Sequence, residues 1–343
     1  MSQFKLIAVV VVACLCGALA ANVKSREYYE QKFYDWLSKY EVQVPTGEHF
    51  VKMLQNFADN DDIIETTNAK KLSYTLGHNQ FSHLSLDEFR AHVRLGLTKP
   101  EYVADAVHPA PAADVKLATS IDWVSSGAVT GVKDQGQCGS CWSFSTTGAL
   151  EGAYYNKYKS LESFSEQNLV DCDKLTNGGK DHGCNGGLMD NAFTWVKKNG
   201  GLCTEADYPY TSGETKDAGT CNTKCTKNSK VAPSTYTDVT PNSDAAFMDA
   251  LNKQPVSVAI EADQSAFQLY KSGVFTATCG TDLDHGVLAV GYGTYVDGTD
   301  YYKVKNSWGT SWGMDGYILL ERGVSQKEGQ CGILSLPSYP TLA

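Results

Sequence analysis

The sequence predicts an α+β protein with two lobes, a helical lobe followed by a β-rich lobe, and a helical segment in front of both. Three observations support this order. Apolar residues recur at three- and four-residue spacing in the first third of the chain. Helical segments are indicated again at residues 141–158 and 190–198, and beyond residue 255 they give way to short alternating runs of β-branched and aromatic residues. Helices first and strands later are typical of an α+β architecture.

The N-terminus has the pattern of a cleaved export signal. Lys5 precedes an apolar run over residues 6–15, and residues 18–20 supply the small side chains that a signal peptidase reads. This run is too short to span a membrane, and no later segment has 18 consecutive apolar residues. We therefore expect residues 1–20 to be a signal peptide and the remainder to be an exported, soluble protein without a membrane span. An uncleaved anchor is the alternative.

Residues 21–116 differ from the rest of the chain because they are rich in charges and contain no cysteine. Their apolar spacing predicts amphipathic helices over residues 27–40 and 48–68. Residues 102–113 are rich in Pro and Ala, which is typical of an exposed linker that suits proteolysis. We expect a domain boundary at residue 116, give or take about five residues, and a second domain over residues 117–343.

The second domain begins around the run Ile121-Asp122-Trp123 and is expected to contain the elements of both lobes. Helices are predicted from Cys141 to about Tyr158, with Phe144, Leu150 and Tyr154 along a buried stripe, and over residues 190–198. Strands are predicted at residues 256–260, 286–292, 301–304 and 316–321.

Composition is that of an ordinary soluble protein, with 42% apolar and 20% charged residues. The formal net charge of −10 disfavours a nucleic-acid partner, because phosphate binding needs clustered Lys and Arg. We therefore expect none.

Cys141 has the surroundings of a reactive thiol. It follows a Gly-Ser pair and opens an expected helix, and His285 and Asn306 come later in the chain. Only the thiolate attacks well, and a helix N-terminus or a neighbouring imidazolium lowers the pKa of a thiol. A histidine can also return a proton to a leaving amine, and an amide can orient its ring. Cys141, His285 and Asn306 are therefore the predicted catalytic residues.

The runs 135–144, 284–293 and 305–316 resemble the papain family of cysteine proteases, in its cathepsin L-like branch. The resemblance implies a papain-like fold with the active site in the cleft between the lobes, and a cysteine endopeptidase made as a zymogen. It also implies that the side-chain amide of Gln135 helps to form the oxyanion hole. Trp308 would cover the hydrogen bond between the catalytic histidine and asparagine.

The same resemblance implies where a substrate would bind. Gly187 would pair with the substrate backbone in β fashion. Apolar residues map to the pocket for the second residue before the cut, here called the S2 pocket: Leu188, Met189, Ala259, Leu283 and Leu336. Trp312 is counted among the substrate-binding residues as well. Because Leu336, at the pocket floor, offers no acid to attract Arg, we expect a preference for Leu, Phe or Val. These residues could equally be plain core.

Residues 21–116 resemble the inhibitory propeptide of this branch. The run Phe57-x2-Asn60-x3-Ile64-x3-Asn68 matches the second half of its helix motif, whereas His49 and Met53 replace an expected Glu and Arg. A second motif, Gly77-x-Asn79-x-Phe81, ends in His83 where an Asp is expected. His83 permits a hypothesis: protonation near a pKa of about 6.5 would loosen the prosegment in an acidic organelle. An exposed loop histidine is the alternative.

Nine of the eleven cysteines lie outside the expected signal peptide, so one thiol should stay free or form an intermolecular bridge. With Cys141 free, the sequence alone does not choose among the pairings of the other eight. The resemblance implies Cys138–Cys184, Cys172–Cys221 and Cys279–Cys331, which leaves Cys203 with Cys225. Exchange of Cys221 and Cys225 between partners stays open.

Other functions were weighed from the same residues. Cys138 and Cys141 could form a thioredoxin-like redox pair, residues 203, 221 and 225 could hint at zinc, and a non-catalytic protein could retain the fold. We expect no metal or cofactor. The expected partners are protein and peptide substrates and the chain's own propeptide, acting as an intramolecular inhibitor on a monomeric enzyme. The expected destination is a lysosome or equivalent acidic vacuole, or secretion.

Overall fold

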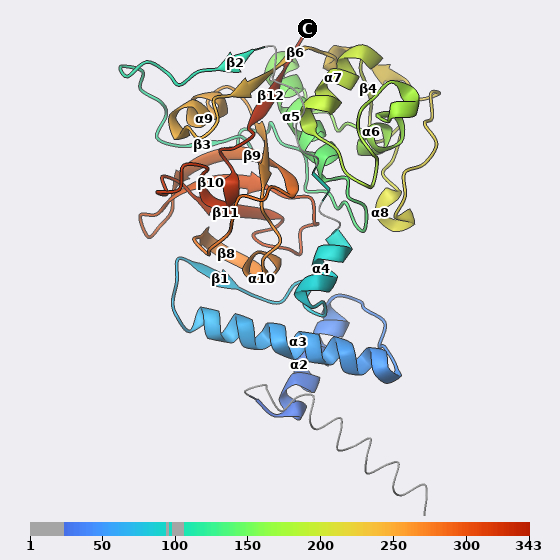
Figure 1. Ribbon diagram of the computed structural model, residues 1–343, viewed down its shortest axis with the longest axis vertical. Helices are drawn as coiled ribbons and strands as arrows, with labels where there is room; N and C mark the ends of the chain where they lie inside the picture. The colour runs from blue at the N-terminus through green and yellow to red at the C-terminus, as the bar shows by residue number, and fades with distance from the viewer. Residues whose placement is uncertain (1–23, 94–95, 98–105) are drawn as a thin grey trace, which may run out of the picture.

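The computed structural model describes residues 24–93, 96–97 and 106–343 (Figure 1). The expected signal peptide lies outside the described residues. Within the described ranges, no helix combines the length and the apolar character that crossing a membrane requires. The two lobes of the catalytic domain stand side by side above the prosegment in this view.

The prosegment is helical, as predicted. It contains α2 (Arg26–Lys39), α3 (Gly47–Asn68), the short strand β1 (Tyr74–Leu76) and α4 (Leu86–Val93). An aromatic core joins α2 to α3, where Phe33 stacks on Trp36 and also contacts Phe57. The long helix α3 lies across the foot of the catalytic domain, with β1 and α4 between them (Figure 1).

Ion pairs join α3 to its neighbours in the prosegment. Asp61, almost fully buried, pairs with Lys32 of α2 and with Nε2 of His78, which lies 2.8 Å from Asp61 Oδ1. Lys52, next to Met53, forms a 2.5 Å ion pair with Glu88 of α4. These contacts fix α3 to α2 and to the chain that follows it.

The helical lobe is built around α5 (Cys141–Tyr158), with α6 (Glu166–Cys172), α7 (Met189–Asn199) and α8 (Ser212–Thr215) beside it. Phe144, Leu150 and Tyr154, predicted to form a buried stripe on α5, are buried, and burial extends to every residue from 141 to 154. Two glycines allow this close packing. A Cβ on Gly148 would lie 2.7 Å from Leu288, and one on Gly152 would lie 2.6 Å from Pro255. The helix therefore sits directly against the β-rich lobe.

One sheet runs through the β-rich lobe and takes in strands of the prosegment at both ends, in the order β1-β8-β11-β10-β9-β7-β12-β6-β2, with β3 paired to β9. Its neighbours are antiparallel except β11 with β8 and β2 with β6. The strands are β2 (Val107–His108), β3 (Ile121–Asp122), β6 (Pro233–Val239), β7 (Val256–Ile260), β8 (Tyr270–Phe275), β9 (His285–Thr294), β10 (Asp300–Lys305), β11 (Tyr317–Glu321) and β12 (Ser338–Leu342).

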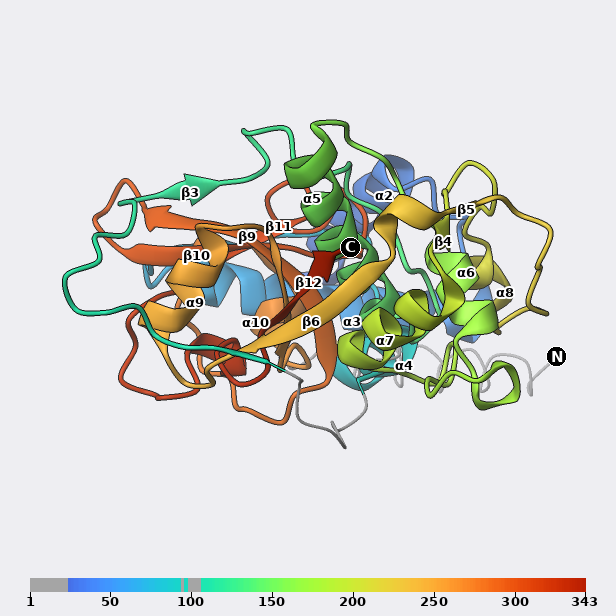
Figure 2. The same ribbon diagram turned by 90° about the horizontal axis from the view of Figure 1, so that it is seen from above.

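Smaller elements complete the fold. Strands β4 (Leu202–Cys203) and β5 (Lys227–Asn228) form a separate pair, and helices α9 (Asp244–Leu251) and α10 (Ser265–Gln268) flank the sheet. Three short 3₁₀ turns are η1 (Leu175–Asn177), η2 (Ser229–Val231) and η3 (Gln330–Gly332). Seen from above, the helical and β-rich lobes lie on opposite sides of α5 and β12 (Figure 2). The two-lobed α+β prediction is confirmed.

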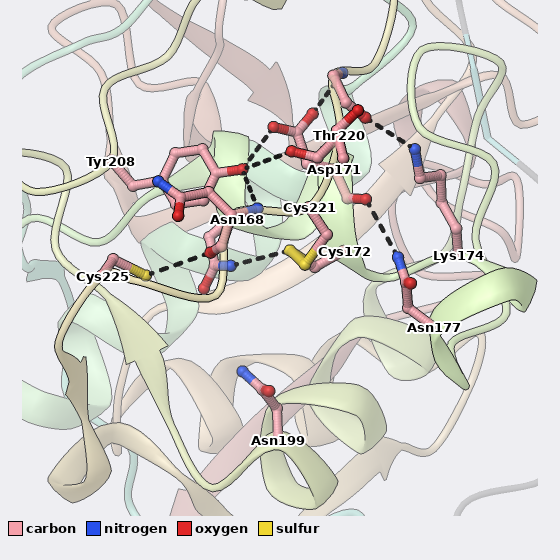
Figure 3. Close-up of a disulfide and its surroundings, with 12 residues drawn as sticks. Asn168, Asp171, Cys172, Lys174, Asn177, Asn199, Tyr208, Thr220, Cys221 and Cys225 are labelled. Atoms are coloured by element: carbon pink, nitrogen blue, oxygen red, sulfur yellow. Dashed lines mark hydrogen bonds between the residues drawn. A yellow bond between two sulfur atoms is a disulfide. The ribbon is translucent and has the colours of Figure 1, made fainter.

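The structure has four disulfides: Cys138–Cys184, Cys172–Cys221, Cys203–Cys225 and Cys279–Cys331. Cys141 is the free thiol of the described residues. With Cys138 bonded to Cys184, the redox pair with Cys141 is not formed, and the cysteines weighed for zinc are in bridges. Figure 3 shows the surroundings of Cys172 and Cys221, where the Tyr208 hydroxyl donates to Asp171 over 2.6 Å.

The predicted exposed linker needs a correction. Residues 102–105 lie outside the described residues, but Val107 and His108 form strand β2 on the edge of β6, and His108 is buried. The reason is that the histidine ring finds hydrogen-bond partners on the catalytic domain. Residues 109–120 remain without helix or strand, and nearly all of them are exposed.

Candidate active site

The N-terminus of α5 and the start of β9 bring Cys141 and His285 to the boundary between the lobes. Ser140 is the N-cap of α5, so Cys141 occupies the first helical position. Gly286 faces this turn so closely that a Cβ there would lie 3.3 Å from the Cα of Trp142. A side chain at this position would therefore crowd the approach of the helix end to the strand carrying the histidine.

His285 is held by residues that follow β10. Its Nε2 lies 2.8 Å from Oδ1 of Asn306, and that oxygen also accepts the backbone N–H of Ser307 at 2.7 Å. Because the oxygen only accepts, Nε2 carries the proton and the neutral ring has its lone pair on Nδ1. Nδ1 is buried and has no hydrogen-bond partner among the described residues. The Trp308 indole stacks over the imidazole, 4.7 Å between ring centres.

The prosegment covers this pair and keeps it neutral. Burial raises the pKa of the Cys141 thiol, although backbone hydrogen bonds from Gly286 and Gly96 oppose the shift. Burial also lowers the pKa of His285 to about 4, against the hydrogen bond that its Nε2–H donates to Asn306. The expected lowering of the thiol pKa is therefore not seen in this form, because water is excluded from both groups.

Prosegment backbone lies across the cleft. Gly187 N–H donates to Gly96 O over 3.0 Å, and Leu97 N–H donates to Asp284 O over 3.3 Å. Leu97 and Gly187 form a parallel bridge. A Cβ on Gly96 would lie 2.5 Å from the carbonyl oxygen of Gly139, so only glycine allows this approach to the turn before Cys141. Gly187 thus pairs with an extended backbone, here that of the prosegment.

The side chain of Gln135 is fully buried beside the same turn. Its Nε2 donates to Val93 O of α4 at 3.2 Å and to Cys138 O at 3.0 Å. Its Oε1 accepts the Ser307 hydroxyl at 2.7 Å. The donor expected to stabilise an oxyanion is therefore engaged with a carbonyl at the end of α4 in this form.

Four of the five residues mapped to the S2 pocket belong to one apolar cluster. Met189 and Ala259 are buried in it, and Leu283 and Leu336 are partly buried against it, whereas Leu188 is buried but lies outside this cluster. Leu97 of the prosegment packs on this cluster too. Trp312 lies elsewhere: it is buried in the β-rich lobe, stacks on Phe267 and donates its indole N–H to the Phe267 carbonyl.

Two supporting groups were missed in the sequence. The Tyr210 hydroxyl donates to Gln135 O at 2.9 Å and bonds to Ser140 Oγ at 2.7 Å, so it links the oxyanion-hole candidate to the N-cap of α5. Beneath the site, Lys133 pairs with Glu166 at 2.6 Å and with Glu151 at 3.3 Å. These residues come from separate segments without a shared motif, so no sequence signal could have found them.

Comparison with known proteins finds a matching family model for each of the two parts of the chain. A family model described as papain family cysteine protease matches residues 117–341, and one described as cathepsin propeptide inhibitor domain (I29) matches residues 33–89. The chain belongs to the papain family. Among its relatives, the senescence-specific cysteine protease SAG39 of Oryza sativa subsp. indica is 41% identical over 355 residues, 99% of each chain. Vignain of Phaseolus vulgaris is 44% identical over 327 residues, 94% of this chain and 87% of the relative.

Solved structures of papain-family precursors superpose on nearly the whole molecule. The recombinant stem bromelain precursor has a TM-score of 0.83 and 38% identity, covering 92% of this chain and 99% of its own. Digestive procathepsin L 3 of Tenebrio molitor larval midgut has a TM-score of 0.78 and 36% identity, covering 93% and 100%. The chain is therefore a cysteine-type peptidase of the cathepsin L-like branch, carrying its inhibitory propeptide domain as a zymogen.

Proposed function

We propose that this zymogen yields an endopeptidase in which Cys141 attacks the peptide carbonyl as a thiolate. The geometry of His285 carries the proposal. Asn306 fixes Nε2 as the protonated nitrogen, so the unpartnered Nδ1 is the atom able to take the thiol proton. When Val93, Gly96 and Leu97 leave the cleft, water reaches both groups and charge separation costs less. The thiol proton then moves to Nδ1, and the helix N-terminus stabilises the thiolate.

The remaining steps follow from the same atoms. The thiolate adds to the substrate carbonyl, and the oxyanion accepts hydrogen bonds from the Gln135 amide and from the backbone N–H of Cys141. The C–N bond then breaks while His285 gives its proton to the departing amine, which leaves an acyl-enzyme. Water, deprotonated by the same ring, attacks this thioester and releases the acid and the free thiol.

The proposed substrate preference is for Leu, Phe or Val two residues before the cut. The mapped residues are all apolar, and Leu97 of the prosegment packs against the same cluster as Leu283 and Leu336, which also contains Met189 and Ala259. Leu97 sits beside Gly187, the residue that would pair with a substrate backbone. A substrate running through the same cleft would present its own apolar side chain to these residues.

The proposed domains are a signal peptide over residues 1–20, a propeptide over 21–116 and a catalytic domain over 117–343. Support for the second boundary comes from the irregular, mainly exposed stretch 109–120, where a protease could bind extended backbone. We propose a monomeric enzyme that is activated by acid in a lysosome or equivalent vacuole, or after secretion. Protein and peptide substrates would be its partners.

Turnover of fluorogenic dipeptides by acid-activated enzyme tests this function. Wild type should cleave substrates that have Leu or Phe two residues before the cut at least about tenfold faster than a substrate that has Arg there. Cys141→Ala should abolish cleavage, and Leu336→Ala should widen the accepted side chains. Equal cleavage rates for the Leu and Arg substrates would contradict the assignment of these residues to an apolar S2 pocket. Full activity of Cys141→Ala would overturn the proposed nucleophile.

A further inference from the structure

A separate contact between the prosegment and the catalytic domain lies away from the cleft, where β2 runs along the edge of β6 (Figure 1). The Asp238 N–H donates to the carbonyl of Ala106 over 3.1 Å. Both the N–H and the hydroxyl of Thr240 donate to the carbonyl of His108, each over 2.9 Å. These bonds depend only on backbone in an extended conformation, so they hold the segment without selecting its side chains.

The side chain of His108 supplies the selectivity. It is 5% exposed and inserted between α9 and β12. Its Nε2 lies 2.8 Å from Asp249 Oδ2, and its Nδ1 lies 2.9 Å from the hydroxyl of Tyr339. The carboxylate only accepts, so Nε2–H donates to Asp249, while Nδ1 accepts from the tyrosine hydroxyl. A neutral imidazole therefore satisfies both partners, whereas the neighbouring Val107 is 52% exposed and contributes no such contact.

We propose that the β6 edge, with Asp249, Tyr339 and Lys253, is a further prosegment-binding site on the catalytic domain, distinct from the cleft and from β8. We call it the latch site. It recognises extended backbone carrying a histidine, and its occupant is the segment 106–108 of this chain. The proposal rests on the proposed division into propeptide and catalytic domain. A cut anywhere in residues 109–120 leaves His108 on the prosegment side. The cleaved prosegment therefore stays attached through its C-terminal end until the latch site releases it.

The charges around the ring determine how acid acts on this contact. Asp249 from α9 favours protonation of His108, whereas burial and the ammonium of Lys253, 3.5 Å from Nδ1, oppose it. Tyr339 and Thr240 face the same segment through hydroxyl groups. Burial and Lys253 prevail and lower the pKa of His108. The contact is therefore strongest above the ordinary histidine pKa and weakens as pH falls, the direction that acid activation requires.

Hydrogen exchange in the full-length Cys141→Ala zymogen tests the latch site without any self-cleavage. His108→Ala should speed exchange of the Asp238 and Thr240 amides by at least about tenfold, because a buried hydrogen-bonded side chain is lost. Val107→Ala, on the same strand, is the matched control and should leave both amides protected. Asp249→Asn should speed exchange as well and should add little to His108→Ala. His108→Gln, which keeps one donor, should lie between wild type and His108→Ala.

A dissociation measurement separates the latch site from the catalytic proposal. The Cys141→Ala zymogen, cut within residues 109–120 by an added protease, should release its prosegment about tenfold faster when it carries His108→Ala. Release at the wild-type rate, or unchanged exchange at Asp238 and Thr240, would overturn the latch site while the protease assignment stands. An equal effect from Val107→Ala would also overturn it, because the histidine pocket would then contribute nothing.

Discussion

At the scale of single residues, the candidate site is organised by one short segment. Asn306 orients the His285 ring, Ser307 holds the side-chain oxygen of Gln135, and Trp308 covers the imidazole. Three consecutive residues thus contact both the proposed base and the proposed oxyanion donor. A substitution at any of them would displace a group whose position matters to the proposed reaction.

Gln135 gives the sharpest residue-scale prediction. Gln135→Ala should lower kcat of the activated enzyme by about 10²- to 10³-fold with little change in KM, because its amide would bind charge that develops only in the transition state. Ser307→Ala should give a smaller loss, since the amide is retained but less well oriented. Steady-state kinetics on a peptide substrate measures both. A change in KM with kcat unchanged would assign Gln135 to substrate binding instead.

The sequence revealed residues in contiguous motifs and missed those that act through space. Cys141, His285 and Asn306 were found because each lies in a run with a specific pattern. Tyr210 contacts both Gln135 and Ser140, yet nothing near it in the chain indicates this role. The state of the thiol was also missed. Its pKa depends on burial by the prosegment, which no local pattern reports.

At the scale of elements, helix and strand positions were largely predictable, and α5 shows the limit. Its residue range was predicted, but its environment was not, because a helix packed on all sides has no single apolar stripe. Small residues on α5, Gly148 and Gly152, contact the β-rich lobe. Glycine is a weak helix former, so only tertiary packing explains its presence at these two positions.

Lys133 connects α5 to α6 by pairing with Glu151 and Glu166, both nearly fully buried. Lys133→Met should destabilise the Cys141→Ala zymogen by about 3–5 kcal/mol near neutral pH, because two buried carboxylates lose their cation. Lys174→Met, which removes a hydrogen bond to a single carbonyl, is the control. Chemical denaturation at pH 7 gives the comparison, and equal stability of both variants would contradict it.

His83 belongs to the turn between β1 and α4. The exposed-loop alternative is wrong, because the ring is only partly accessible and lies 5.0 Å from Trp36, centre to centre. Burial and the nearby His92 lower the pKa of His83 to about 4, against the field of Glu88. The unfolded histidine, with a pKa near 6.5, takes up its proton first. The neutral ring therefore stabilises the prosegment above that pH, and this stability is lost as pH falls towards 4.

His83→Gln should therefore lower the pH of autoactivation by about one unit. Up to about 3 kcal/mol of prosegment stability, which wild type loses when His83 takes up a proton, would no longer depend on pH. The exposed His49→Gln is the matched control in the same prosegment. Processing followed across pH 4–7 measures the shift. An unchanged pH profile of processing for His83→Gln, or the same shift for His49→Gln, would contradict the hypothesis that His83 is the acid trigger.

At the scale of the whole molecule, the prosegment touches the catalytic domain at separate places. β1 pairs with β8 of the β-rich lobe, Gly96 and Leu97 lie in the cleft, and β2 lies on β6. Both ends of the large sheet are thus completed by prosegment strands. The sequence predicted an inhibitory prosegment but not this arrangement, because the pairing of short strands such as β2 depends on edges formed by distant residues.

These contacts make the masking of Cys141 the central property of the zymogen. Labelling with a peptidyl epoxide, located by mass spectrometry before and after acid activation, tests it most directly. We predict no modification of the intact zymogen at neutral pH. After removal of residues 21–116, we predict stoichiometric modification of Cys141 with matching loss of turnover. An unreactive Cys141 in fully processed enzyme, or equal labelling of the intact zymogen, would contradict this mechanism.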